Sequence, residues 1–231
     1  SQRAVISGIE REEDGTFSVR TRKETFRTRT ILIASGAEHR HLDIPGEDDF
    51  YGMGVSYCAS CDGAFYRGKT VAVIGGGNTA VEDALYLARG CSKVYVIHRR
   101  DDFRCAPVLQ KAVMERENVE ILWNRTAAEI LGDEEVEGIR LRSVITGEET
   151  ELAVDGVFIA VGMAPNTGFL RGLVELDKAG YVIAGEDGVT GTEGIFAAGD
   201  VRTKKLRQVV TAVSDGANAM NAIEEYLRSG I

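Results

Sequence analysis

The chain has 231 residues, of which 44% are hydrophobic and 27% are charged, with 27 glycines, 3 prolines and 4 cysteines. This composition excludes a collagen-like repeat, low-complexity disorder and a small disulfide-stapled domain, and the length predicts one large domain or two of modest size. The formal net charge of -9 disfavours a general affinity for nucleic acid or for anionic membranes. Because no apolar run reaches the roughly 20 residues of a membrane helix and no signal-peptide pattern is found, we expect a cytoplasmic protein.

The N-terminal residues are predicted to form paired β-strands. Residues 5–10 and 16–22 flank an Asp14-Gly15 turn, which favours a hairpin. Residues 25–37 continue the pairing. The apolar run at residues 31–34 has no polar interruption, which is typical of a strand that is buried on both faces.

The same arrangement recurs later in the chain. Residues 136–144 and 150–161 are predicted strands around a Thr146-Gly147 turn, and they end in a second continuous apolar run. The two runs read ILIASG and VFIAVG and lie 126 residues apart. We interpret the recurrence as an internal duplication rather than as two unrelated buried strands.

A proline follows each copy, in the segments HLDIPGE and MAPNTG. Because proline restricts the backbone angle φ, Pro45 and Pro165 are interpreted as rigid crossovers between two bodies. This interpretation predicts a domain of residues 45–165 that is inserted into a discontinuous domain of residues 1–44 and 166–231.

Two cysteines with redox spacing follow the first crossover. Cys58 and Cys61 are separated by two residues, and Asp62 comes directly after them. A pair with this spacing can form, open and re-form a disulfide, and a neighbouring carboxyl group can carry the proton that a thiolate needs. The pair therefore indicates disulfide exchange.

Other interpretations of the cysteine pair stay open on the sequence. A zinc site would combine the pair with His39 and His41, although the spacing is unusual for zinc. The two thiols can also be buried and reduced, or form a permanent disulfide, which is rarer in a cytoplasmic protein. Cys91 and Cys105 have no partner by spacing and are interpreted as ordinary thiols.

A glycine-rich turn follows the cysteine pair, between the predicted strand 70–74 and a predicted helix that stops at Gly90. Its first glycine permits a tight turn, its second lets the backbone approach a pyrophosphate, and the small residue at the third position lets the helix pack against the strand. Free N–H groups at the helix start favour phosphate. The predicted dinucleotide-binding residues here are Gly75, Gly76, Gly77, Asn78, Thr79 and Ala80.

The next predicted strand, residues 93–98, indicates which dinucleotide is bound. An NAD site usually places a carboxylate about 20 residues after the glycine turn, but no acidic residue precedes Asp101 in this region. A basic cluster stands there instead, and guanidinium groups suit a 2′-phosphate. The sequence therefore predicts that NADPH is the bound dinucleotide; the alternative is that these arginines form a solvated basic face. The residues of this predicted site are His98, Arg99, Arg100 and Arg104.

A further helix is predicted from Pro107 to about Glu117. After the second crossover come a predicted hairpin near residues 180–183 and a buried strand at 194–198. A final helix follows. Its apolar and small residues recur at spacings of three and four, which predicts one closely packed face. That face comprises Val209, Val213, Gly216, Met220, Ile223 and Leu227.

A resemblance to the low-molecular-weight thioredoxin reductases, a class of pyridine nucleotide-disulfide oxidoreductases, is carried by three runs: YCASCDGAFYRGKTVAVIGGGNTAVEDALYLA, VIHRRDDFR and GIFAAGDVRTKKLRQVVTAVSDGANA. The similarity extends from about Val5 to the end. It implies an α/β fold with two Rossmann-like domains, for FAD and NAD(P), one inserted in the other. Each would have a central parallel sheet and a β-meander layer.

The resemblance also implies an activity, in which electrons pass from NADPH to FAD, then to the disulfide, then to thioredoxin. By position, Cys61 would face the flavin, Cys58 would exchange with thioredoxin, and Asp62 would act as the acid. A homodimer is implied as well. The implied FAD-binding residues are Gly36, Gly199, Asp200, Arg207, Gln208 and Val209, with Asp200 on the ribityl chain and the last three along the isoalloxazine.

One family feature is missing, the glycine-rich FAD loop. Gly75 precedes Ile159 by 84 residues, and the same spacing back from Ile33 falls before Ser1. We therefore expect a complete NADPH domain and an incomplete FAD domain, with weak or absent FAD binding unless the loop is supplied. Two other functions stay open: a reductase for another dithiol or peroxiredoxin-type partner, and a non-catalytic NADPH-binding redox module.

Overall fold

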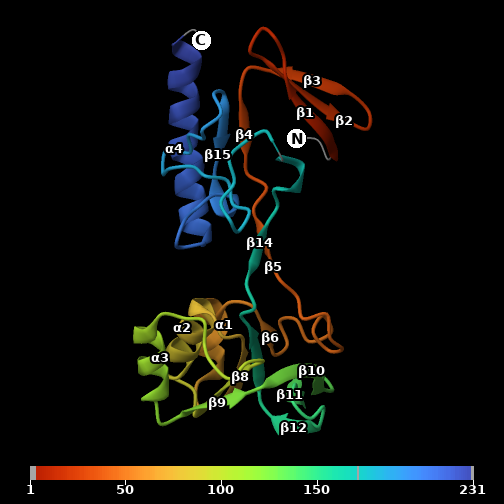
Figure 1. The fold of residues 1–231 in the computed structure, drawn as a ribbon, viewed down its shortest axis with the longest axis vertical. Helices are drawn as coiled ribbons and strands as arrows, with labels where there is room; N and C mark the ends of the chain where they lie inside the picture. Colours follow the sequence, from red (N-terminus) through yellow and green to blue (C-terminus); the bar gives the residue numbers. More distant parts are fainter. Residues whose placement is uncertain (1–3, 171, 230–231) are drawn as a thin grey trace. The chain divides into compact units, whose positions relative to one another are not determined.

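The structure is a computed structural model that describes residues 4–170 and 172–229. The chain forms two compact units, one from the described parts of residues 1–38 and 163–231 and the other from residues 39–162 (Figure 1). Strands β5 (Ala37–His39) and β14 (Met163–Pro165) carry the chain from one unit to the other and pair with each other. We call the discontinuous unit the outer unit and residues 39–162 the inserted unit.

The inserted unit is built on a parallel sheet of five strands in the order β6-β13-β7-β8-β9. Its central strands are continuous apolar runs because side chains on both of their faces are buried. In register, Ile74 lies opposite both Ile97 and Ile159. The strand bounds are β6 Val55–Ser56, β7 Thr70–Ile74, β8 Lys93–His98, β9 Val119–Trp123 and β13 Gly156–Ile159.

Helices cover one face of this sheet. They are α1 (Ala59–Asp62), the 3-10 helix η1 (Gly63–Tyr66), α2 (Asn78–Leu87) and α3 (Pro107–Met114). The buried side of α2 is made of small and aliphatic residues that pack on Val71, Val73, Val94 and Val96. The helix α3 ends before the predicted Glu117, because the chain turns there to enter β9 and the Arg116 N–H bonds the Val113 carbonyl.

A three-stranded antiparallel meander covers the other face. It comprises β10 (Arg125–Gly132), β11 (Val136–Ser143) and β12 (Glu149–Ala153). Ile130, Ile139 and Leu141 of the meander join Ala72 and Val157 of the sheet in a second core. The inserted unit therefore has three layers, helices, parallel sheet and meander.

The outer unit repeats part of this plan. A meander of β1 (Ile6–Arg11), β2 (Phe17–Thr21) and β3 (Thr25–Thr28) leads into β4 (Ile31–Ile33), which pairs in parallel with β15 (Ile195–Ala197). The 3-10 helices η2 (Gly168–Leu170) and η3 (Gly199–Val201) and the helix α4 (Val209–Arg228) complete it. Meander, short parallel strand and crossover strand follow in the same order in both units, as the predicted duplication requires.

Two predictions about the outer unit are wrong. The run at residues 31–34 is not buried on both faces: Leu32 is 37% exposed and Ile33 is 3% exposed, so the described residues cover only one face of β4. The face predicted for α4 is also largely exposed, with Val209 at 81% and Val213 at 67%. Of the predicted face, Ile223 is buried, and it is joined on the buried side of α4 by Asp215 and Ala219, which were not predicted.

The buried side of α4 is set by contacts that hydrophobic spacing does not encode. Asp215 accepts hydrogen bonds from cationic side chains of the preceding segment. Gly188, at φ 74°, brings its backbone so close to Ala219 that an added Cβ would lie 2.8 Å from the Ala219 Cβ. These contacts turn the valines at the start of the helix outward.

The passage between the units lies at residues 38–39 and 162–163. Pro45 thus lies inside the inserted unit, where its carbonyl accepts a hydrogen bond from the Ile130 N–H at 2.9 Å. Within the described residues, no helix is both long and apolar enough to cross a membrane.

Candidate functional site

A cavity of about 590 Å³ opens in the inserted unit at the carboxyl ends of its central strands. It is lined by residues that follow three neighbouring strands: Gly75 after β7, His98 at the end of β8 and Ala160 after β13. The chain runs from β7 to β8 on one side, and β13 lies on the other side of β7. Nucleotides bind at such a switch point in open parallel sheets.

The glycine turn forms the floor of this cavity, and its glycines differ in what surrounds them. At Gly75, with φ 151°, an added Cβ would lie 2.4 Å from the Ala160 oxygen and 2.7 Å from the Ala80 Cβ. The fold itself therefore requires Gly75. An added Cβ at Gly77 would meet nothing within 4 Å, so the fold leaves space on that side of Gly77.

Gly77 is also the N-cap residue of α2, and no side chain caps this helix. Asn78 and Thr79, the first helical residues, line the cavity as well. The first N–H groups of an uncapped helix are free to bind an anion. The turn therefore offers donors and open space to a pyrophosphate.

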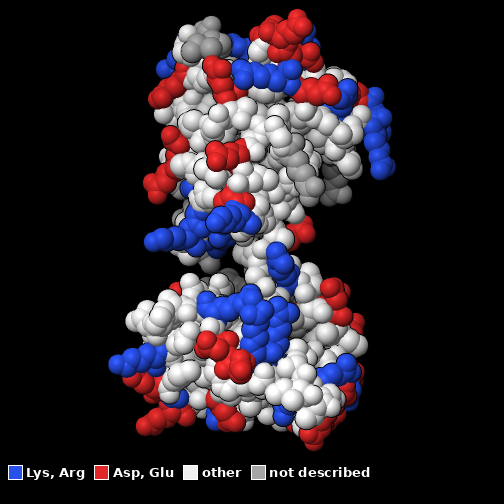
Figure 2. All heavy atoms as spheres, in the orientation of Figure 1, with Lys and Arg blue, Asp and Glu red and all other residues white. Residues whose placement is uncertain are grey.

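Five arginines and no carboxylate line the same cavity: Arg40, Arg99, Arg100, Arg104 and Arg125. Within the part of the chain that the structure describes, none of the five forms an ion pair. Asp101 and Asp102 are exposed and do not line the cavity. Figure 2 shows Lys and Arg side chains gathered on one face of the inserted unit. Although the net charge of the chain is -9, the lining of this cavity is suited to a polyanion.

Arg40 and Arg125 were not predicted from the sequence, because they belong to no motif and come from distant segments. Asn124, at φ 54°, turns the chain from β9 into β10, and its N–H donates to the Arg100 carbonyl at 3.1 Å. This bond fixes the start of β10 beside the end of β8. A positive φ at a non-glycine residue is rarely visible in a sequence.

His98 is only 7% exposed, and its ring stacks on Phe103 with the centroids 5.9 Å apart. Burial lowers the pKa of His98, and the positive charges of Arg100, Arg99 and Arg104 act in the same direction. The Nε2 atom lies 3.1 Å from the Asp102 carbonyl oxygen. As a neutral ring with a proton on Nε2, His98 donates to that carbonyl.

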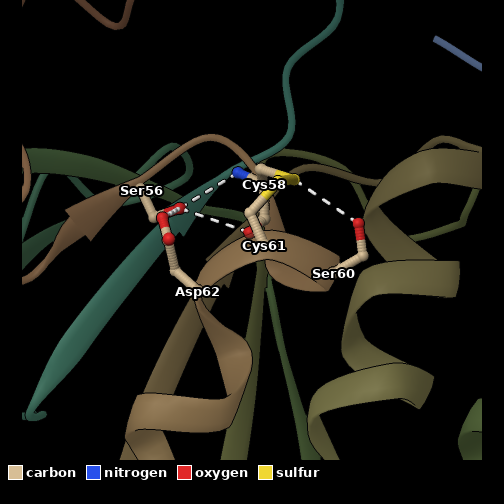
Figure 3. Close-up of a disulfide and its surroundings, with 5 residues drawn as sticks. All are labelled: Ser56, Cys58, Ser60, Cys61 and Asp62. Atoms are coloured by element: carbon tan, nitrogen blue, oxygen red, sulfur yellow. Dashed lines mark hydrogen bonds between the residues drawn. A yellow bond between two sulfur atoms is a disulfide. The ribbon is translucent and has the colours of Figure 1, made fainter. Parts of the chain in front are cut away.

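Cys58 and Cys61 form a disulfide at the start of α1, with their Cα atoms 5.3 Å apart (Figure 3). Cys58 is the N-cap residue and is half-buried, whereas Cys61 is exposed. The disulfide is therefore accessible from outside the inserted unit. Within the described residues, no group of three or more His, Cys, Asp and Glu side chains is arranged to hold a metal ion.

Ser56, which the sequence did not single out, connects the disulfide to Asp62 (Figure 3). Its buried hydroxyl oxygen accepts a hydrogen bond from the Cys58 N–H at 3.0 Å and donates to Asp62 Oδ2 at 2.7 Å. The hydroxyl thereby holds the Asp62 carboxylate beside the redox pair. It comes from the end of β6, where no motif distinguishes it from an ordinary strand serine.

The other two cysteines lie in the core of the inserted unit. Burial raises the thiol pKa of both Cys91 and Cys105. Because thiolates are the reactive species, these thiols are poor nucleophiles at neutral pH.

The outer unit contains one buried polar atom that lacks a partner. Asp200 Oδ1 is buried and has no hydrogen-bond partner within the described residues. The neighbouring Gly199, at φ 77°, donates its N–H to Asp215 Oδ2 at 3.0 Å. An unpaired buried carboxylate oxygen is costly, about 1–3 kcal/mol or more, so Asp200 points to a ligand with hydroxyl donors.

A buried ionic cluster, not predicted from the sequence, holds this turn. Arg202 Nε and Lys204 Nζ each donate to Asp215 Oδ2 at 2.8 Å. Burial alone would raise the pKa of Asp215, but the hydrogen bonds from Arg202, Lys204 and Gly199 outweigh it and lower that pKa to about 2. The only sequence signal is an acidic residue within the apolar pattern of α4.

The remaining residues implied for FAD lie in the same unit. The Arg207 guanidinium lies over the Tyr181 ring at 4.1 Å, and Gln208 forms a capping box with Thr211 at the start of α4. Val209 is exposed there. Gly36, at φ 71°, has open space where a Cβ would stand.

The chain matches known proteins over most of its length. The sequence profile of the pyridine nucleotide-disulphide oxidoreductases matches residues 3–216. The thioredoxin reductase of Treponema pallidum is 44% identical over 216 residues, which cover 94% of this chain and 70% of that protein. The thioredoxin reductase of Listeria innocua is 46% identical over 205 residues, 88% of this chain and 64% of that protein. The chain belongs to the thioredoxin reductase family.

A solved structure agrees with this assignment. The thioredoxin reductase from Streptococcus pyogenes superposes with a TM-score of 0.90 at 42% identity, covering 98% of this chain and 74% of that one. The predicted fold class is thereby confirmed, two Rossmann-like domains with one inserted in the other. The chain spans 64–70% of the length of the two curated thioredoxin reductases named above.

Membership in the thioredoxin reductase family implies FAD and NADPH as cofactors. The residues present fit both. The unpartnered Asp200 oxygen suits a hydroxyl of the FAD ribityl chain, and the open glycine turn with its arginines suits a phosphorylated dinucleotide.

Proposed function

We propose that this chain carries out the NADPH-binding and disulfide-exchange steps of thioredoxin reduction. The observation that carries the proposal is the presence, in one unit, of an arginine-lined cavity at a glycine turn and of an accessible disulfide. A bound FAD would supply the two-electron transfer that links NADPH to the Cys58–Cys61 disulfide. Family membership supports thioredoxin as the acceptor.

The thiols of Cys58 and Cys61 then pass two electrons to the thioredoxin disulfide. The Cys58 thiolate attacks the thioredoxin disulfide, forming a mixed disulfide and releasing one thioredoxin thiolate. Cys61 attacks the mixed disulfide, which restores Cys58–Cys61 and releases the second thiolate. Asp62, held by the Ser56 hydroxyl, takes the proton from the attacking thiol and passes it to a departing thiolate.

The same proposal assigns the domains. The inserted unit, predicted from the sequence as residues 45–165 and found as residues 39–162, binds NADPH and carries the cysteines, whereas the outer unit forms part of the FAD domain. Thioredoxin reduction by a cytoplasmic homodimer belongs to the proposal as well. Its support is the family and the two buried free cysteines, which a cytoplasmic protein tolerates.

Dinucleotide preference tests the proposed cofactor site. Each guanidinium contact to a 2′-phosphate contributes about 1.5–3 kcal/mol, so the chain should bind NADP⁺ at least about 100-fold more tightly than NAD⁺ in calorimetric titrations. The Arg100→Ala variant should lose about tenfold or more of that preference. Lys111→Ala, an exposed cation on α3, serves as the matched control and should leave the preference unchanged. Equal affinity of the unmodified chain for NADP⁺ and NAD⁺ would refute the proposed site.

A further inference from the structure

The three predicted arginines belong to a short segment, residues 99–106, which we call the arginine loop. Two hydrogen bonds tie this loop to the glycine turn. The Arg104 N–H donates to the Gly76 carbonyl at 2.8 Å, and the Ala106 N–H donates to the Asn78 side-chain oxygen Oδ1 at 2.9 Å. The floor of the cavity and its basic wall are therefore joined directly.

His98 fills the space inside this arrangement. Its ring lies where a side chain at Gly76 would be, because an added Cβ at Gly76 would stand 2.2 Å from His98 Cε1. The opposite nitrogen, Nε2, bonds the Asp102 carbonyl in the middle of the loop. The loop thus wraps around the ring, while its far end is secured at Ala106 by Asn78.

Of the two hydrogen bonds between the glycine turn and the arginine loop, only the bond from the Ala106 N–H is accepted by a side chain, that of Asn78. Asn78 is the first residue of α2, and Ala106 is the N-cap residue of α3. Pro107, the next residue, has no N–H, so the Ala106 N–H is one of the few donors at the start of α3, and the Asn78 oxygen accepts its hydrogen bond. Loss of this oxygen frees the loop two residues after Arg104.

We infer that Asn78 is a positioning residue that sets the preference for a 2′-phosphorylated dinucleotide, by holding the arginine loop through the Ala106 N–H. The inference rests on the proposed dinucleotide site. It assigns two functions to the glycine turn. The backbone binds the pyrophosphate, which NADP⁺ and NAD⁺ share. The Asn78 side chain positions the arginines that bind the 2′-phosphate, which only NADP⁺ has.

The test is the ratio of the NAD⁺ to the NADP⁺ dissociation constant, measured by calorimetry on the full chain. Because both dinucleotides carry the pyrophosphate, effects at that group cancel in the ratio. Asn78→Ala should lower the ratio about three- to tenfold, the value of one hydrogen bond, with the NAD⁺ affinity kept.

Thr79→Ala is the matched control, because Thr79 lines the cavity beside Asn78 and no hydrogen bond from its side chain is found within the described residues. It should change both dissociation constants by the same factor. An Asn78→Ala ratio equal to that of the unmodified chain would overturn the inference while leaving the proposed function intact. If the unmodified chain shows no preference for NADP⁺, the proposed function fails first.

Discussion

Replacing Gly77 with alanine should weaken NADP⁺ binding by at least about 100-fold and leave the stability of the chain unchanged. The backbone at Gly77 is extended, with φ -92° and ψ -177°, which any residue adopts. Apart from the adjoining backbone, no heavy atom of the described residues lies within 4 Å of the added methyl group. Only a ligand that contacts the Gly77 backbone needs the glycine, and a methyl group there would displace a pyrophosphate. Calorimetric titration and thermal unfolding measure the two effects.

Gly75→Ala is the matched control and should behave in the opposite way. Its added methyl group meets the Ala160 oxygen and the Ala80 side chain, and its φ of 151° disfavours alanine, so the inserted unit should lose about 1–3 kcal/mol or more of stability. If Gly77→Ala binds NADP⁺ like the unmodified chain, the pyrophosphate does not lie against this turn.

The second large effect concerns the two sulfurs of the redox pair. The Cys61→Ser variant, with a free Cys58 thiol, should form a mixed disulfide with a single-cysteine thioredoxin that is activated as its thionitrobenzoate disulfide. The Cys58 thiolate attacks the thioredoxin sulfur and releases thionitrobenzoate, whose absorbance gives the rate. The Cys58→Ser variant should react at least about 100-fold more slowly, because we propose that Cys58 is the exchanging sulfur.

The remaining thiols do not obscure this comparison. Cys91 and Cys105 are buried, and burial raises their pKa, so neither should react on the same time scale. Equal rates for the two variants would contradict the assignment of Cys58. A failure of both variants to react would argue against thioredoxin as the partner.

The sequence predicted the inserted unit more accurately than the outer one, for a physical reason. Strands β7 and β8 have the predicted bounds, residues 70–74 and 93–98, because continuous apolar runs ended by glycine or charge are local signals. The glycine turn is equally local. Its predicted neighbours line one cavity because the carboxyl ends of neighbouring parallel strands meet at one edge of the sheet.

Features made by distant segments could not be predicted in this way. Arg40 and Arg125 reach the cavity through strand order and turns, which no spacing in the chain reveals. Ser56 is close to Cys58 in the sequence, but no motif distinguishes it there. Apolar spacing along α4 predicted the burial of Ile223 correctly but that of Val209 and Val213 wrongly, because the helix instead buries Asp215, which binds two cations. Hydrophobic periodicity does not register a buried charge that is fully paired.

The proposed electron path is tested most directly by counting thiols in the protein, with FAD supplied in excess, after one equivalent of NADPH is added without oxygen. Alkylation followed by mass spectrometry should find Cys58 and Cys61 modified and their disulfide gone, with Cys91 and Cys105 unmodified before denaturation. The same mixture without FAD should keep the disulfide. A flavin that is bleached by NADPH while Cys58 and Cys61 remain joined would contradict the path.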